Sequence, residues 1–226
     1  MTVTATLGDQ SVSIKVTIKP KAVIGIDAGH QAHANYGLEA IGPGSSVKKI
    51  KVSGGTSGVY TGKPEYKLTL EVAKKLRKEL IKRGYKVVMT RTTHNVNISN
   101  KQRALKLNKK CDISIRLHAD GSTSSSVKGA SVLYPSMSNP YLSNKICKKS
   151  RKLAQEILSS YCSATSISSR GLYTRDDLTG TNWSKIPVVL LEMGFMTNSS
   201  DDKYMSSKKG QKAIVKGIAN GIDAYF

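Results

Sequence analysis

Residues 22–30 read Ala-Val-Ile-Gly-Ile-Asp-Ala-Gly-His, a short apolar run that ends in glycine and polar residues. A run of this length, bounded in this way, predicts a strand that is buried in a sheet. Similar runs predict further strands along the chain. They cover residues 85–90, 111–118, 130–134, 171–174 and 188–191.

Apolar residues recur at helical spacing between these runs. In residues 65–83 an apolar side chain stands at every fourth position, and Gly84 predicts the end of that helix. Ser99 followed by Gln102 has the capping-box pattern that begins a second helix. Two more helices are predicted over residues 142–161 and 208–226.

The alternation of strands with helices predicts an α/β fold with a mostly parallel sheet. A chain of 226 residues suits one domain, which we place at residues 21–226. Residues 1–20 alternate polar and apolar and predict a β-hairpin, either an edge addition to the sheet or the remnant of a preceding domain. Residues 28–63 have no period, so we expect a functional loop or short extended pieces there.

The composition restricts the class of protein less than the pattern does. A formal net charge of +21 predicts attraction to polyanions, and nucleic acid, anionic wall polymers or merely solvated lysine faces all remain open. No apolar run approaches the roughly 20 residues of a membrane span, and residues 1–20 lack the apolar block of a signal peptide. Cys111, Cys147 and Cys162 form no disulfide framework or thiolate metal motif, so we interpret them as core residues.

Four polar residues stand where a parallel sheet would gather them. His30, His118 and Glu192 each come at the carboxyl end of a predicted strand, and Glu65 opens a helix. Ligands of open α/β sheets bind outside the carboxyl ends of the strands, so these four side chains are expected at one rim. Glu192 directly follows Val-Val-Leu-Leu, where a carboxylate is costly unless it is paired or bound.

Two imidazoles and two carboxylates on one rim suit a catalytic zinc site, in which three residues bind the metal and a further carboxylate moves protons. The residues alone leave alternatives open. Either histidine could be a hydrogen-bonded structural residue, Glu65 could merely favour its helix dipole, and His33 is a competing ligand. No H-E-x-x-H helix is present.

Several motifs, in this order and spacing, resemble one known family. They are Ile26-Asp27-Ala28-Gly29-His30, Thr61-Gly62-Lys63-Pro64-Glu65, Gly84-Tyr85-Lys86-Val87 with Thr90-Arg91, Leu117-His118-Ala119-Asp120, and Leu191-Glu192-Met193-Gly194-Phe195 with Met196-Thr197-Asn198. From Ala22 to Phe226 the chain resembles the zinc-dependent N-acetylmuramoyl-L-alanine amidases of the amidase_3 type. Departures include Ala28 where proline is frequent, Gln31-Ala32 where a glycine pair is frequent, and Asp120 where asparagine is frequent.

The resemblance implies a function and a role for each site residue. His30, Glu65 and His118 would bind Zn²⁺, and Glu192 would be the general base and acid for a metal-activated water. That water would cleave the amide between N-acetylmuramic acid and L-alanine in peptidoglycan.

The implied fold is one domain with a roughly six-stranded sheet flanked by helices. The family often has an arginine at the positions of Arg103 and of the Arg170-Gly171 pair. Each of these arginines would be either structural or in contact with substrate.

The expected partners are peptidoglycan and anionic wall polymers, with no specific nucleic acid, and the expected location is the cell wall or outside the cell. A zinc carboxypeptidase or endopeptidase acting on the stem peptide is the competing enzyme. A non-catalytic wall-binding or nucleic-acid-binding module is the competing class, and it would be expected to have lost a ligand or the base.

Overall fold

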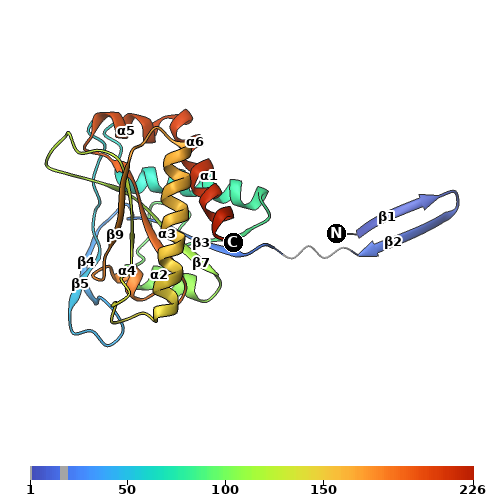
Figure 1. Ribbon diagram of the computed structural model, residues 1–226, viewed down its shortest axis with the longest axis horizontal. Helices are drawn as coiled ribbons and strands as arrows, with labels where there is room; N and C mark the ends of the chain where they lie inside the picture. Colours follow the sequence, from blue (N-terminus) through green and yellow to red (C-terminus); the bar gives the residue numbers. More distant parts are fainter. Residues whose placement is uncertain (1, 16–19) are drawn as a thin grey trace.

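The computed structural model describes residues 2–15 and 20–226, and a six-stranded sheet forms its centre (Figure 1). The strand order is β6-β3-β7-β10-β8-β9. The strands are β3 (Val23–Ala28), β6 (Lys86–Met89), β7 (Ile113–Asp120), β8 (Ala130–Tyr134), β9 (Ser169–Thr174) and β10 (Val188–Phe195).

Four neighbouring strands, β6, β3, β7 and β10, run parallel. Strand β8 runs antiparallel to β10, and β9 follows the direction of β8. The predicted α/β fold with a mostly parallel sheet of six strands is therefore confirmed. The parallel set brings the carboxyl ends of β3, β7 and β10 to the same edge.

Helices α1 (Glu65–Lys82), α3 (Asn144–Ala164) and α6 (Lys208–Tyr225) pack on one another and on one face of the sheet (Figure 1). That face is apolar, because Ile24, Ile26, Ile115 and Leu117 alternate along β3 and β7 and belong to the main core. The opposite face of the same strands carries polar side chains. They include Asp27, Arg116 and His118.

Smaller elements cover the polar face. Helix α2 (Asn100–Asn108) lies close to β3, since a Cβ built on Gly25 would stand 3.1 Å from the Leu107 side chain. Next to α2 are α4 (Thr179–Asn182) and the antiparallel pair β4 (Asn35–Ala40) and β5 (Lys48–Val52). This pair is the kind of short extended structure expected in the long loop. Helix α5 (Ser199–Ser206) follows β10.

The predicted helix boundaries have the expected capping chemistry. Gly84 follows α1 at φ +90°, and the Tyr85 amide donates to the Leu80 carbonyl while the Gly84 amide donates to that of Ile81. These two bonds make a Schellman motif. The capping box at the start of α2 is also confirmed, with the Ser99 hydroxyl accepting from the Gln102 amide.

Some predicted boundaries were wrong. Strands β7 and β10 continue to Asp120 and Phe195, beyond the predicted ends at residues 118 and 191. His118 is therefore not the last residue of its strand, and Glu192 lies within a strand rather than directly after one. A register shift between Glu192 and Phe195 lets β10 continue beyond the apolar run. Helix α3 begins at Asn144 rather than residue 142, because the Ser143 side chain caps it.

The amino-terminal hairpin consists of β1 (Thr2–Leu7) and β2 (Gln10–Lys15). Within the described residues these strands pair only with each other, so the edge addition to the main sheet was a wrong alternative. Val16 and Ile18, predicted as part of this hairpin, lie outside the described residues. All three cysteines are free, as expected from their number and spacing. Cys111 and Cys147 are buried, whereas Cys162, also interpreted as a core residue, is only partly buried.

None of the helices within the described part of the chain has the length and apolarity needed to cross a bilayer.

Candidate metal centre

His30 reaches the site from a turn just after β3. Its backbone has φ 57°, a left-handed conformation that is uncommon for a residue with a side chain. Two buried arginines hold this turn by its carbonyl groups. Arg91 donates to the carbonyls of Ala28 and Gly29, and Arg103 donates to those of Ala28 and His30. These bonds fix where the imidazole of His30 points.

Glu65 reaches the site from the first turn of α1, and its side chain is buried. Its carboxylate accepts hydrogen bonds from the Thr56 amide at 3.1 Å and from the Ala119 amide at 3.1 Å. The helix amino-terminus adds a favourable dipole for a negative charge. Burial alone would raise the pKa of Glu65, but the hydrogen bonds with His118 and His30 hold it well below its usual range.

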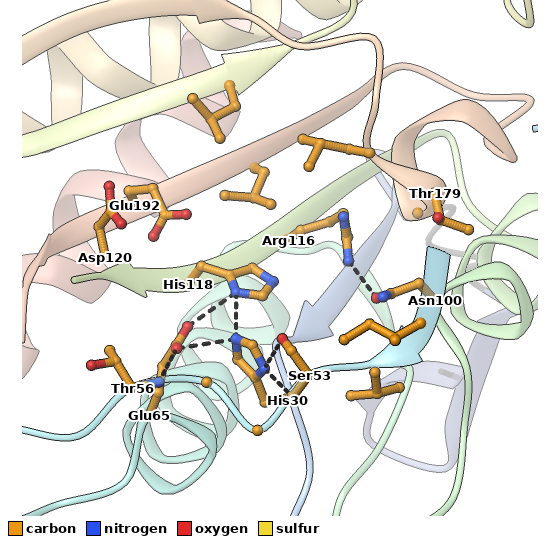
Figure 2. A pocket seen from close by; sticks show the side chains of 18 of the residues that line it. His30, Ser53, Thr56, Glu65, Asn100, Arg116, His118, Asp120, Thr179 and Glu192 are labelled. Carbon is orange, nitrogen blue, oxygen red and sulfur yellow. Dashed lines mark hydrogen bonds and ion pairs between the residues drawn. The ribbon is translucent and has the colours of Figure 1, made fainter. Parts of the chain in front are cut away.

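The side chains of His30, Glu65 and His118 converge on one point (Figure 2). Nε2 of His30 lies 3.0 Å from one carboxylate oxygen of Glu65, and Nδ1 of His118 lies 3.0 Å from the other. The two ring nitrogens are 3.2 Å apart. These three side chains, from the turn after β3, from β7 and from α1, form a candidate metal site.

The donor set fits a divalent metal such as zinc. Four ligands at zinc-nitrogen distances of about 2.1 Å stand roughly 3.4 Å from one another in a tetrahedron, close to the spacings seen here. Nδ1 of His30 contacts the Ser53 carbonyl at 2.9 Å, which places the proton on Nδ1 and leaves the Nε2 lone pair for a cation. Burial lowers the pKa of His118 to about 4, so its imidazole is neutral, as a ligand must be.

Glu192 lies beside this cluster on β10 (Figure 2). In the parallel pairing of β10 with β7 it stands directly opposite His118. Its Oε2 atom is buried and has no hydrogen-bond partner in the described residues. Burial, and then the nearby carboxylates of Glu65 and Asp120, raise the pKa of Glu192 well above its usual value.

All four predicted side chains line one cleft of about 670 Å³. The cleft extends away from the three-residue cluster, between the β4–β5 pair and the segment before α4. In this part of the cleft Lys49 and Asp177 form an ion pair at 2.7 Å. The expectation that His30, Glu65, His118 and Glu192 share a rim is thus met.

The structure separates the remaining candidates. His33 lies outside the cluster, although its sequence position made it a competing ligand. Arg103 is fully buried and holds the His30 turn, which makes it structural. Arg170 is exposed and does not line the cleft.

Sequence reasoning missed Arg116, which lines the cleft and binds Asp27 at 3.0 Å. Its position two residues before His118 in a strand, hence on the same face, was the available indication.

The family model described as "N-acetylmuramoyl-L-alanine amidase" (Amidase_3) matches residues 24–224. The chain belongs to this amidase family. The six-stranded sheet and the three-residue cluster are thus those of a peptidoglycan-cleaving N-acetylmuramoyl-L-alanine amidase, and the resemblance noted in the sequence is confirmed.

Individual amidases resemble this one along most of its length. The N-acetylmuramoyl-L-alanine amidase Rv3717 of Mycobacterium tuberculosis is 29% identical over 214 residues, which cover 90% of this chain and 86% of that protein. The probable cell wall amidase LytH of Staphylococcus epidermidis is 26% identical over 96% of this chain, which spans 62% of LytH. The crystal structure of the amidase Ami1 from Mycobacterium smegmatis superposes with a TM-score of 0.81 at 26% identity, covering 91% of this chain and 97% of that chain.

Proposed function

We propose that this amidase depends on zinc and uses it to hydrolyse the amide between N-acetylmuramic acid and L-alanine, outside the cytoplasm in the cell wall. The observation that supports this most is the convergence of His30, Glu65 and His118 in a cleft of an amidase_3 domain. Two imidazoles and one carboxylate are a known ligand set for zinc hydrolases.

The three ligands are His30 through Nε2, His118 through Nδ1 and Glu65 through its carboxylate. When bound, zinc would polarise the scissile carbonyl and lower the pKa of a coordinated water. Hydrogen bonds from the backbone amides of Thr56 and Ala119 hold the Glu65 carboxylate in place, and the Ser53 carbonyl fixes the tautomer of His30. Such outer partners keep a site ready for its metal.

Glu192 is the general base and then the general acid. Its place opposite His118 puts a carboxyl group within the cleft but outside the three-residue cluster. Its unpartnered oxygen is free to accept a proton from water and to deliver that proton to the departing amino group of L-alanine. Residues 21–226 form the catalytic domain in this proposal.

Digestion of purified sacculi tests the proposal. The expected products are intact stem peptides with a free L-alanine amino-terminus, identified by mass spectrometry, and a chelator should abolish their release until zinc is restored. A peptidase acting on the stem would instead release fragments cut inside the peptide and leave the muramoyl amide intact. That product pattern would overturn the proposed reaction.

A further inference from the structure

A second groove, of about 530 Å³, lies between α1 and α6, which pack side by side in Figure 1. It shares no residue with the catalytic cleft. Six lysines line it, together with Arg83 and a single carboxylate, Glu79. The lysines are Lys75, Lys78 and Lys82 on α1 and Lys208, Lys212 and Lys216 on α6.

The lysines of α6 form a regular stripe. Lys208, Lys212 and Lys216 are each four residues apart, so they lie on one helix face with a spacing of about 6 Å. Lys78 and Lys82 have the same spacing on α1, across the groove. Two buried residues, Val215 and Gln211, line the groove together with these lysines.

The protein's own acids leave this charge largely uncompensated. Glu79 is paired with Arg83, which also binds Asp223 at 2.7 Å. In the part of the chain that the structure describes, the three α6 lysines and Lys78 and Lys82 have no carboxylate within 4 Å. Like charges four residues apart destabilise a helix, so helix stability does not explain the stripe. Two facing rows of unpaired cations instead suit a linear polyanion.

We propose that this groove binds a linear phosphodiester polymer of the bacterial wall and so holds the amidase against its substrate. This inference rests on the proposed function, which brings the enzyme to the wall. Lysine is a compact point charge, which suits phosphates that follow one another along a flexible chain.

Nucleic acid fits the groove less well. None of the groove residues is aromatic, so bases would find no surface for stacking, which contributes about 1–3 kcal/mol per base in single-strand binding proteins. Arg83, the one arginine, already has two carboxylate partners. The groove can therefore recognise only the charges of a polyanion, and a phosphodiester polymer without bases supplies these.

The groove is well separated from the catalytic cleft along α1. Lys78 stands thirteen positions after Glu65 on α1, a rise of about 20 Å along the helix. A polymer in the groove would therefore leave the catalytic cleft open to the glycan and its peptide.

Sedimentation of the full chain with purified walls tests the proposal. Walls that bear the phosphodiester polymer are compared with walls from which it has been removed by hydrofluoric acid, over a range of salt concentrations. We expect strong retention only on the polymer-bearing walls. The variant with Lys78→Gln, Lys212→Gln and Lys216→Gln should bind them several-fold more weakly, and its logarithmic salt slope should fall by about 2, from three lost contacts at roughly 0.7 each.

A matched variant removes the same charge elsewhere. Lys145→Gln, Lys148→Gln and Lys149→Gln change exposed lysines of α3 that do not line the groove, and this variant should bind as the wild type does. Equal losses in the two variants would overturn the proposal, as would undiminished binding to stripped walls. Competition by a DNA oligonucleotide or by anionic vesicles that equals competition by the free polymer would also overturn it.

Hydrolysis of stripped walls is measured in parallel. The groove variant should digest them at the wild-type rate, which also shows that it folds. No digestion by the wild type would contradict the proposed function, whereas the retention measurements judge the groove independently.

Discussion

At the scale of single residues, the site depends on a backbone conformation that the surrounding structure imposes. His30 has φ 57°, and its carbonyl and those of the two preceding residues are bound by buried arginines. Such conformations cost about 1–3 kcal/mol and persist only where the surroundings over-determine them. Here the conformational cost at His30 is offset by the contact that the conformation allows, between Nε2 of His30 and the carboxylate of Glu65.

Metal binding provides the first test at this scale. His118→Ala removes one of the three proposed ligands, and the loss of a ligand lowers metal affinity steeply, so zinc content after dialysis should fall close to zero. His33→Ala is the matched control, because His33 lies outside the cluster and should leave the zinc content unchanged. A full zinc complement in the His118 variant would remove that residue from the ligand set.

Proton transfer provides the second test. Glu192→Gln keeps the shape of the side chain and removes its ability to take a proton, so turnover on sacculi should fall by about 100-fold or more. Zinc content should stay at the wild-type level, since Glu192 lies outside the three-residue cluster. Near-normal hydrolysis would show that another group moves the proton.

The four site residues could be predicted because each stands at a recognisable place, at a strand end or at a helix start. Their distances could not, since these depend on β7 and β10 being neighbours in register. Arg116 was overlooked because a single polar residue in an alternating strand is typical of any half-buried sheet. Its ion pair with Asp27 joins residues 89 positions apart, which no local pattern reveals.

At the scale of elements, periodicity located the long helices and the buried strands, because burial imposes a repeat on the sequence. The pair β4–β5 and helices α4 and α5 are too short to show such a repeat. The pair β4–β5 is mostly exposed, and the four residues of α4 are buried but are all polar or glycine. The sequence also did not predict that β8 and β9 run opposite to the other four strands. Strand direction depends on how the chain connects over the sheet, and both directions allow an apolar strand.

The end of α1 provides a test of local structure. Gly84→Ala should lower the free energy of unfolding by roughly 1–2 kcal/mol, because a Cβ disfavours φ +90°. A clash contributes nothing, as the nearest atom to the added Cβ is 4.0 Å away. Gly54→Ala meets no atom within 4 Å and needs no positive φ, so urea denaturation should show little change for it. Equal effects in both variants would argue against the conformational explanation.

At the scale of the whole molecule, one buried carboxylate connects three elements behind the site. Asp27 of β3 binds Arg103 of α2 at 2.9 Å and Arg116 of β7 at 3.0 Å. Burial opposes its ionisation, but the two guanidinium groups hold the pKa of Asp27 well below its usual range. The ion pairs thus fix the position of α2 against the sheet, and with it the Arg103 contact to the His30 turn.

Asp27→Asn should therefore cost about 3–5 kcal/mol in the free energy of unfolding at pH 7, because two buried cations lose their partner. A folded-state pKa below the unfolded value means that the carboxylate stabilises the fold fully above about pH 4 and loses this contribution as the pH falls further. The gap between wild type and variant, measured by urea denaturation, should narrow from about pH 4 downward. If the difference in the free energy of unfolding between wild type and variant did not change with pH, the stabilisation could not be due to the ionised carboxylate of Asp27.

The amino-terminal hairpin should be dispensable for both the fold and the reaction. The apolar side chains of Leu7, Val12 and Ile14 are 87%, 65% and 63% exposed, so they bury little surface against the catalytic domain. Apolar burial is the main source of stability, at about 25 cal/mol per Å², and here there is little to lose. Removing residues 1–19 should leave the melting temperature and the digestion of sacculi unchanged. A lower melting temperature would show that the hairpin packs on the domain, whereas slower digestion at an unchanged melting temperature would give it a part in engaging the wall.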